Sequence, residues 1–208
     1  MCTRQKKDSR KNELVKEEEM DIIVKNLCKS YDHNQVLDHF SCTFREKKMT
    51  CIMGKSGIGK STLLSILMGL EKADDGTVSG IEHQKISAIF QENRLFENLD
   101  AVTNIHITTG KTKEEIAGFL KKMGLDDVAG KPVSEYSGGM KRRVAIARAL
   151  LAEYDILIMD EPLQGLDAET KEKVATVIKT QTAGKTVLFV THDEKEAEFF
   201  EAERVELS

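Results

Sequence analysis

The chain has 208 residues and a formal net charge of −4, with 40% hydrophobic and 32% charged residues. This balance is typical of one ordinary globular domain, and it gives no electrostatic reason for binding nucleic acid or an anionic membrane. No apolar stretch approaches the ~18 residues needed to span a bilayer. The cysteines form no Cys-x-x-Cys pair and have no histidine at ligand spacing, so we expect reduced thiols and no zinc site. They are Cys2, Cys28, Cys42 and Cys51.

The N-terminal residues 1–20 are rich in charge and contain no apolar core segment. This composition excludes a secretory signal and predicts a disordered tail or the first turn of a helix. Met20 stands directly before the first strand-like run, so we expect translation to begin at either Met1 or Met20.

Extended runs follow the tail. The segments "IIVKNLCKSY" and "VLDHFSCTF" predict two strands separated by a polar turn. The segment "MTCIM" predicts a short strand that leads into the glycine-rich stretch "GKSGIGKST", and "STLLSILMGL" predicts a helix directly after it. A further strand is expected at "ISAIF".

The middle of the chain changes to helical periodicity. Thr112 and Glu115 have the spacing of a capping box at the start of "TKEEIAGFLKKMGL". Apolar residues then recur at the spacing of one helical face, at Ile116, Phe119, Leu120 and Met123. A second helix is expected over "SGGMKRRVAIARALLA".

The C-terminal part returns to strands. The unbroken apolar runs "DILIM" and "TVLFV" are typical of strands covered on both faces, as in a parallel sheet, and a helix lies between them at "ETKEKVATVIKTQ". We therefore predict one α/β domain over residues 21–208, with a mainly parallel central sheet, antiparallel strands at its N-terminal end and an α-helical insertion at about residues 98–151.

The glycine-rich stretch fits the pattern of a phosphate-binding loop, G-x-x-x-x-G-K-S. Glycines let successive N–H groups point into one concavity, Lys60 adds a mobile positive charge, and the Ser61 hydroxyl is a ligand for Mg²⁺. A glycine-rich structural turn is the alternative, but the strand before and the helix after favour the loop. The predicted binding residues are Gly54, Lys55, Ser56, Gly57, Ile58, Gly59, Lys60, Ser61 and Thr62.

Two further stretches narrow the chemistry. In "DILIMDEP" an apolar strand delivers Asp160, a Mg²⁺ ligand, and Glu161, a general base, to the edge of the sheet where ligands bind. Alone, two acids that cap a strand would be the simpler interpretation. In "YSGGM" the turn Ser137–Gly139 opens a helix and offers a second anion site. Two copies arranged head to tail would bring each loop against the other copy's turn.

These motifs resemble the ATP-binding cassette family of P-loop NTPases over Asp21–Ser208. The family order is phosphate loop, glutamine loop, signature, second carboxylate motif and switch histidine. The matching residues here are the loop 54–62, Gln91, the signature Ser137, Gly138, Gly139 and Met140, the pair Asp160 and Glu161, and His192. The match departs at Met140, where glutamine is usual, and at Tyr136 and Gly165.

The resemblance implies that the protein binds ATP and Mg²⁺ and hydrolyses the nucleotide. It implies catalytic roles for Lys60, Gln91, Glu161 and His192. It also implies that Ser61, Gln91 and Asp160 organise the Mg²⁺ ion. Tyr31 stands where the family stacks an aromatic ring on adenine, and Asp167 ends the loop that crosses to the partner subunit.

The same resemblance implies partners. A single cassette of this length typically works with integral-membrane permease subunits, a second copy of itself and an extracytoplasmic solute-binding protein, as a peripheral protein on the cytoplasmic face of the cell membrane. The stretches "FQENRLFENLDAVTNI" and "YSGGMKRRVAIARAL" resemble importers of the nitrate, sulfonate and taurine type. The alternatives are an exporter ATPase of the antibiotic or lipoprotein class, a cassette in DNA repair or translation, and an ATP-holding clamp without turnover. No nucleic-acid partner is expected.

Overall fold

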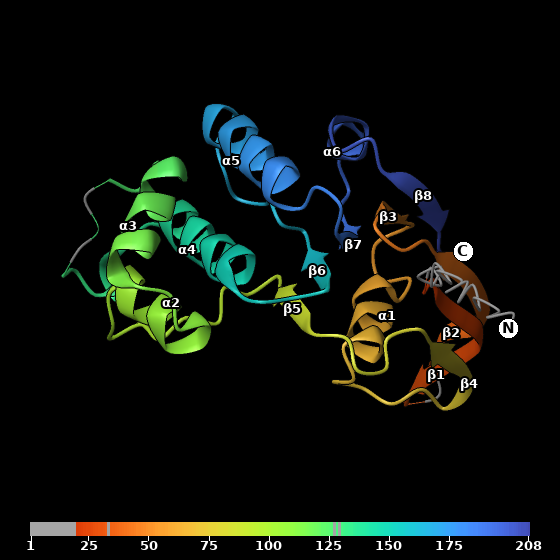
Figure 1. Cartoon of the computed structure of the whole chain (residues 1–208). Coiled ribbons are helices and arrows are strands. Elements are labelled where there is room, and N and C mark those ends of the chain that lie inside the picture. The colour runs from red at the N-terminus through yellow and green to blue at the C-terminus, as the bar shows by residue number, and fades with distance from the viewer. Residues whose placement is uncertain (1–19, 33, 127, 129) are drawn as a thin grey trace, which may run out of the picture.

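The structure is a computed structural model and describes residues 20–32, 34–126, 128 and 130–208. The tail predicted over residues 1–20 lies outside the described residues except for Met20. Figure 1 shows a sheet-containing part and a group of helices to one side of it. Among the described residues, no helix has both the length and the apolar character that crossing a bilayer requires.

A parallel sheet forms the centre, with strand order β5-β6-β7-β3-β8. Its strands are β3 (Met49–Met53), β5 (Ile86–Ile89), β6 (Ile156–Asp160), β7 (Thr186–Val190) and β8 (Glu203–Glu206). Every residue of β7 and all but the last residue of β6 are buried, because helices cover both faces of the sheet. The prediction of two fully covered strands is confirmed.

A smaller antiparallel sheet has the order β2-β1-β4, with β1 (Ile22–Tyr31), β2 (Asn34–Phe44) and β4 (Asp75–Ser79). Helix α1 (Lys60–Leu67) lies between this sheet and one face of the parallel sheet. The apolar side chains of all three meet in one cluster, which includes Phe44, Leu63 and Leu188. The two N-terminal strands predicted from the sequence are confirmed, whereas β4 was not predicted.

The helices on the other side are α2 (Ala101–Thr109), α3 (Lys113–Lys122), the short 3₁₀ helix η1 (Val133–Glu135) and α4 (Gly138–Leu151). The predicted capping box is formed, because Glu115 N–H donates to the Thr112 hydroxyl and Thr112 N–H donates to the Glu115 carboxylate. A second cluster of buried side chains joins these helices to the other face of the parallel sheet and to α5 (Ala168–Gln181) and α6 (Glu194–Phe199).

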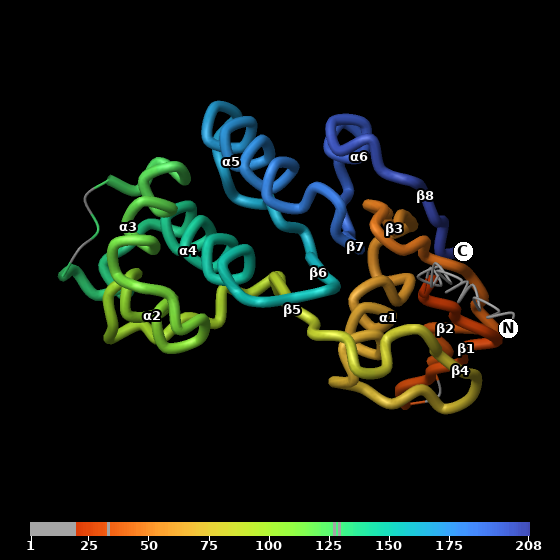
Figure 2. Tube along the Cα trace, in the orientation of Figure 1, coloured from red at the N-terminus to blue at the C-terminus, as the bar shows by residue number. Residues whose placement is uncertain are grey.

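The path of the chain explains this arrangement. Figure 2 shows that the chain leaves the parallel sheet after β5, runs through α2, α3 and α4, and returns at β6. Strands β5 and β6 are neighbours in the sheet, and β5 lies at its edge. The helices are therefore attached to the sheet at one edge, through the carboxyl end of β5 and the amino end of β6.

Candidate active site

The glycine-rich loop joins the end of β3 to the start of α1, as predicted. Gly54, Gly57 and Gly59 all have positive φ, a conformation that other residues rarely adopt. A Cβ atom on Gly59 would lie 2.6 Å from the backbone oxygen of Val36, so the loop also has no room for a side chain there. The loop conformation thus depends on its glycines.

The amino end of α1 carries no side-chain cap from the described residues, so its first N–H groups are free for an anion. Lys60 is buried, and its Nζ donates to the backbone oxygens of Gly54 at 2.7 Å and Lys55 at 2.9 Å. The ammonium group therefore lies inside the curve of the loop. This position suits a cation that binds phosphate oxygens.

A cavity of about 300 Å³ opens above this loop. It gathers side chains from separate parts of the chain that the sequence analysis proposed, among them Ser61, Gln91 and Asp160, and it adds Val36, Gln164 and Val190, which were not proposed. Its lining residues are Val36, Ser56, Gly57, Gly59, Lys60, Ser61, Thr62, Gln91, Asp160, Glu161, Gln164, Val190 and His192. Of the predicted nucleotide-binding residues, Tyr31, Gly54, Lys55 and Ile58 do not line it.

Glu161 and His192 lie next to each other in the lining of the cavity. Glu161 Oε1 lies 3.1 Å from His192 Nε2 but makes no aligned hydrogen bond within the described part of the chain. Burial raises the pKa of Glu161, while the nearby His192 opposes the shift and the negative Glu196 adds to it. A carboxylate with a raised pKa is a stronger proton acceptor. Glu161 is therefore suited to act as a base.

Arg142 was missed by the sequence analysis. Its side chain, 4% exposed, reaches from α4 to the carbonyl ends of β5 and β6. The guanidinium donates to the backbone oxygens of Phe90, Gln91, Asp160, Glu161 and Pro162. A signal was present, because Arg142 shares a helical face with the buried Ala145, Ile146 and Ala149, and a charge within an apolar face needs polar partners.

A family model described as "ABC transporter" matches residues 37–164, which is more than half of the chain. The chain belongs to the ABC transporter family. The predicted P-loop NTPase fold and the expected ATPase domain are therefore confirmed.

Relatives and solved structures agree with this assignment. The aliphatic sulfonates import ATP-binding protein SsuB of Yersinia pestis is 39% identical over 185 residues, which are 85% of this chain and 68% of that protein. The sulfate/thiosulfate import ATP-binding protein CysA of Nephroselmis olivacea is 32% identical over 196 residues, and the match spans 86% of this chain but 57% of that protein. The dimeric structure of the bacterial ABC transporter cassette MJ0796 matches 89% of this chain and 94% of its own, with 31% identity and a TM-score of 0.79.

The signature turn of this ABC cassette does not line the cavity in its own chain. Ser137 caps α4, where its hydroxyl accepts from Met140 N–H at 3.2 Å, and both Ser137 and Gly138 are exposed. A Cβ on Gly139 would lie 3.6 Å from the Leu166 side chain, so the turn lies beside the segment that leads to α5. The single chain thus leaves the signature turn outside its own candidate site.

Asp167 caps the next helix of the cassette. Its carboxylate accepts from Thr170 N–H at 3.0 Å at the start of α5, and hydrogen bonds from Thr170 lower the pKa of Asp167. Four residues on, Lys171 Nζ lies 2.7 Å from both Asp193 and Glu196. Lys171 therefore joins the first turn of α5 to Asp193, which directly follows His192, and to Glu196 in α6.

Tyr31 ends β1 and is 43% exposed. Lys29 Nζ lies 5.1 Å from the centre of the Tyr31 ring and is also paired with Glu71 at 2.8 Å and Asp74 at 3.3 Å. The ring is thus held beside a buried cation, and its proposed contact with adenine stays a prediction.

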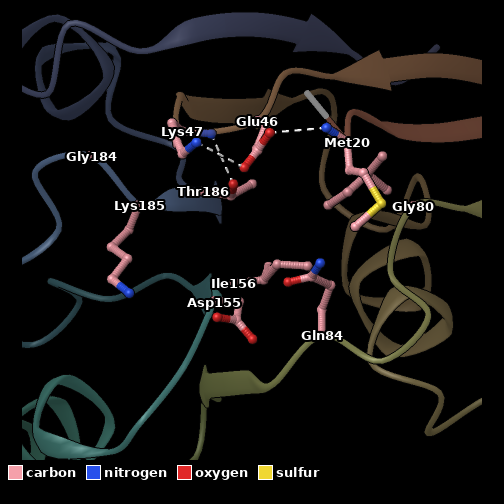
Figure 3. Close-up of a pocket in the computed structure, with 11 residues that line it drawn as sticks. Met20, Glu46, Lys47, Gly80, Gln84, Asp155, Ile156, Gly184, Lys185 and Thr186 are labelled. Atoms are coloured by element: carbon pink, nitrogen blue, oxygen red, sulfur yellow. Dashed lines mark hydrogen bonds and ion pairs between the residues drawn. The ribbon is translucent and has the colours of Figure 1, made fainter. Parts of the chain in front are cut away.

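A second cavity, of about 130 Å³, lies at the opposite end of the parallel strands, where β6 and β7 begin (Figure 3). Local hydrogen bonds hold its rim, including one from Lys47 N–H to the Thr186 hydroxyl and one from Met20 N–H to the Glu46 carboxylate. None of the predicted site residues lines this cavity. The candidate chemistry is therefore assigned to the cavity above the phosphate loop.

Proposed function

We propose that this ABC cassette hydrolyses MgATP at the cavity above the phosphate loop and uses the energy to power import through a membrane permease. The observation that carries the proposal is the convergence on one cavity of Ser61 from the loop, Asp160 and Glu161 from the end of β6, and His192 after β7. These residues lie far apart in the sequence and bring a phosphate site, a metal site and a base together.

The donors fit the expected cofactors. The loop N–H groups and Lys60 would hold phosphate oxygens, for which Lys60 would exchange its present bonds to the carbonyls of Gly54 and Lys55. Hydroxyl, amide and carboxylate oxygens of Ser61, Gln91 and Asp160 are the hard ligands that Mg²⁺ prefers. When bound, Mg²⁺ neutralises charge on the phosphate oxygens.

The remaining chemistry falls to Glu161 and His192. Glu161 orients the attacking water and accepts its proton at the carboxylate, and the raised pKa of Glu161 favours that transfer. His192 Nε2 lies 3.1 Å from Glu161 Oε1 without an aligned hydrogen bond to it, so its N–H would be free to donate toward the terminal phosphate.

The proposal includes a second copy of the chain. The signature residues Ser137–Met140 lie outside the cavity of their own chain, so a head-to-tail pair would supply them from the partner, together with the loop ending at Asp167. The dimeric MJ0796 cassette supports this arrangement by its similarity. A related structure of that cassette is described as a post-hydrolysis state bound to ADP and Pi.

The direction of transport is proposed from the relatives, because SsuB and CysA are both named import proteins. We propose integral-membrane permease subunits and an extracytoplasmic solute-binding protein as partners, with the cassette peripheral on the cytoplasmic face of the cell membrane. An exporter stays the alternative. The similarity to an Atm1-family exporter, at 21% identity and a TM-score of 0.81, concerns the fold alone.

The test is phosphate release by the purified chain and by Glu161→Gln, with the exposed Glu169→Gln as the matched control. We expect E161Q to lower turnover by a factor of about 10² to 10⁴, as for loss of a general base, while a fluorescent ATP analogue still binds. E169Q should keep wild-type turnover. Near-wild-type turnover by E161Q would refute the role of Glu161 as general base. Transport is tested separately by purification from membranes, and failure of the cassette to co-purify with any permease would refute the transport function.

A further inference from the structure

The pairing of β1 and β2 is irregular at Cys28. Leu27 pairs with Phe40 and Lys29 pairs with Leu37, so Cys28 alone faces the two residues Asp38 and His39. An extra residue on one strand is a β-bulge, which redirects side chains at that position. His39 has the positive φ of +46° that such a bulge accommodates.

The bulge gathers three metal-ligating side chains at the surface. Cys28 is half-buried, whereas the side chains of Asp38 and His39 are each 71% exposed. The Cys28 Sγ atom lies 3.6 Å from His39 Nδ1, and one ligand atom from each of the three residues lies within 4.8 Å of the others. No other group of this kind was found among the described residues.

The spacing suits a tetrahedral cation. Zn–S bonds of about 2.3 Å and Zn–N bonds of about 2.0–2.1 Å place the sulfur and nitrogen about 3.6 Å apart in a tetrahedral site. Cys28 and His39 therefore already have the separation of two ligands on one ion. A rotation of the exposed Asp38 side chain would complete a third bond.

Local bonds orient the donors before any ion binds. His39 N–H donates to Cys28 Sγ at 3.3 Å, and Gln35 Nε2 donates to Asp38 Oδ1 at 2.8 Å. The Cys28 thiol also donates a hydrogen bond to the backbone oxygen of Asn26, with Sγ 3.6 Å from that oxygen. Metal binding would release the thiol proton.

We propose that Cys28, Asp38 and His39 bind a thiophilic divalent transition cation of the Zn²⁺ class, separately from the nucleotide site. A thiolate, an imidazole and a carboxylate select such ions over Mg²⁺ and Ca²⁺, which prefer oxygen ligands throughout. Burial raises the pKa of the other two described thiols, Cys42 and Cys51, to about 12, so they are poor competing ligands at neutral pH.

The site has two physical consequences. Three protein ligands leave one tetrahedral position for water or for a donor from another molecule. The bound ion also links β1 to β2, because Cys28 comes from one strand and Asp38 and His39 from the other. Ion binding to the folded chain should therefore stabilise the hairpin of β1 and β2, whose first strand ends at Tyr31.

The test is titration of the untagged, nucleotide-free, Mg²⁺-free chain with Co²⁺ as a spectroscopic probe for Zn²⁺. We expect a near-ultraviolet band from thiolate-to-Co²⁺ charge transfer that saturates at one equivalent and disappears when Zn²⁺ is added. Cys28→Ser should abolish the band. Asp38→Asn and His39→Asn should each weaken Co²⁺ binding at least about tenfold. Asparagine is chosen at His39 because it tolerates positive φ.

Two matched controls share the chemistry but not the site: Cys2→Ser and His83→Asn, at an exposed histidine that also has positive φ, should both keep the band. The proposal is overturned if no band forms, if the band survives C28S, if C2S removes it, or if D38N and H39N bind as tightly as wild type. Should C28S fold poorly, peptide mapping of wild type replaces it, and Zn²⁺ must slow maleimide labelling of Cys28. None of these readouts uses ATP, so their failure is independent of the proposed ATPase function.

Discussion

Replacing Arg142 with methionine should destabilise the fold and the candidate site together. Methionine keeps much of the side-chain length but donates no hydrogen bonds. The four shortest bonds of the guanidinium, to the backbone oxygens of Phe90, Asp160, Glu161 and Pro162, are 2.5–2.9 Å long. All four acceptors would lose a charged donor in a place where Arg142 itself is buried.

The magnitude follows from these bonds. Hydrogen bonds to charged groups contribute about 1.5–3 kcal/mol each, and the methionine recovers part of that loss because a thioether costs little to bury. We expect the free energy of unfolding to fall by about 3–5 kcal/mol, and Tm to fall by about 6–20 °C in a chain of this size. Turnover should also fall by at least about tenfold, since the backbone of Gln91 and Glu161 would lose its support.

Urea denaturation and phosphate release measure the two effects. The control is Arg45→Met, because Arg45 is exposed and its side chain makes, within the described ranges, just a surface ion pair with Glu203 at 3.3 Å. R45M should change stability by no more than about 0.5 kcal/mol. Arg142→Lys should be intermediate, since one ammonium cannot serve all the carbonyls. If R142M unfolds within about 1 kcal/mol of wild type and turns over within twofold, Arg142 is not the link described here.

Further perturbations have equally specific outcomes. Gly59→Ala should abolish binding of a fluorescent ATP analogue, since its Cβ would lie 2.6 Å from the Val36 oxygen; unchanged affinity would contradict the loop geometry. Lys171→Met removes the cation that pairs with Glu196, whose side chain is 7% exposed. The free energy of unfolding, measured by urea denaturation, should therefore fall by about 1–3 kcal/mol. Lys171→Arg keeps the positive charge and should stay near wild type. Cys51 is buried, and burial raises the pKa of its thiol to about 12, so the thiol stays protonated at pH 8. Iodoacetamide should therefore label Cys51 only in denaturant. Fast labelling of the folded chain would contradict a buried thiol.

Much of the sheet was predictable because its strands have strong local signals. The apolar runs of β6 and β7 leave no polar face, and the loop before α1 has glycines and a lysine at fixed spacing. Strand β4 has no such signal. Its sequence "DGTVS" contains Gly76 and alternates weakly, and it becomes a strand because β1 offers it a pairing edge.

The residues of the candidate site also divide into those with a local sequence signal and those without one. The phosphate loop and Asp160–Glu161 could be predicted because each motif is contiguous in the sequence. The role of Arg142 depends on carbonyls that lie about fifty residues before it and about twenty after it, which only the packing of α4 brings together. The approach of Cys28 to His39 depends on a shift in strand register. Sequence spacing alone contained neither relation.

The attachment of α2, α3 and α4 through adjacent strands has a mechanical consequence. Since the polypeptide leaves the sheet after β5 and returns to it at β6, we expect any displacement of these helices to bend the chain at those two crossings. Strands β3 and β7, which lead into the phosphate loop and to His192, take no part in these crossings. Arg142 extends from α4 to the ends of β5 and β6, so such a displacement would directly alter its hydrogen bonds to the backbone of Gln91 and Glu161.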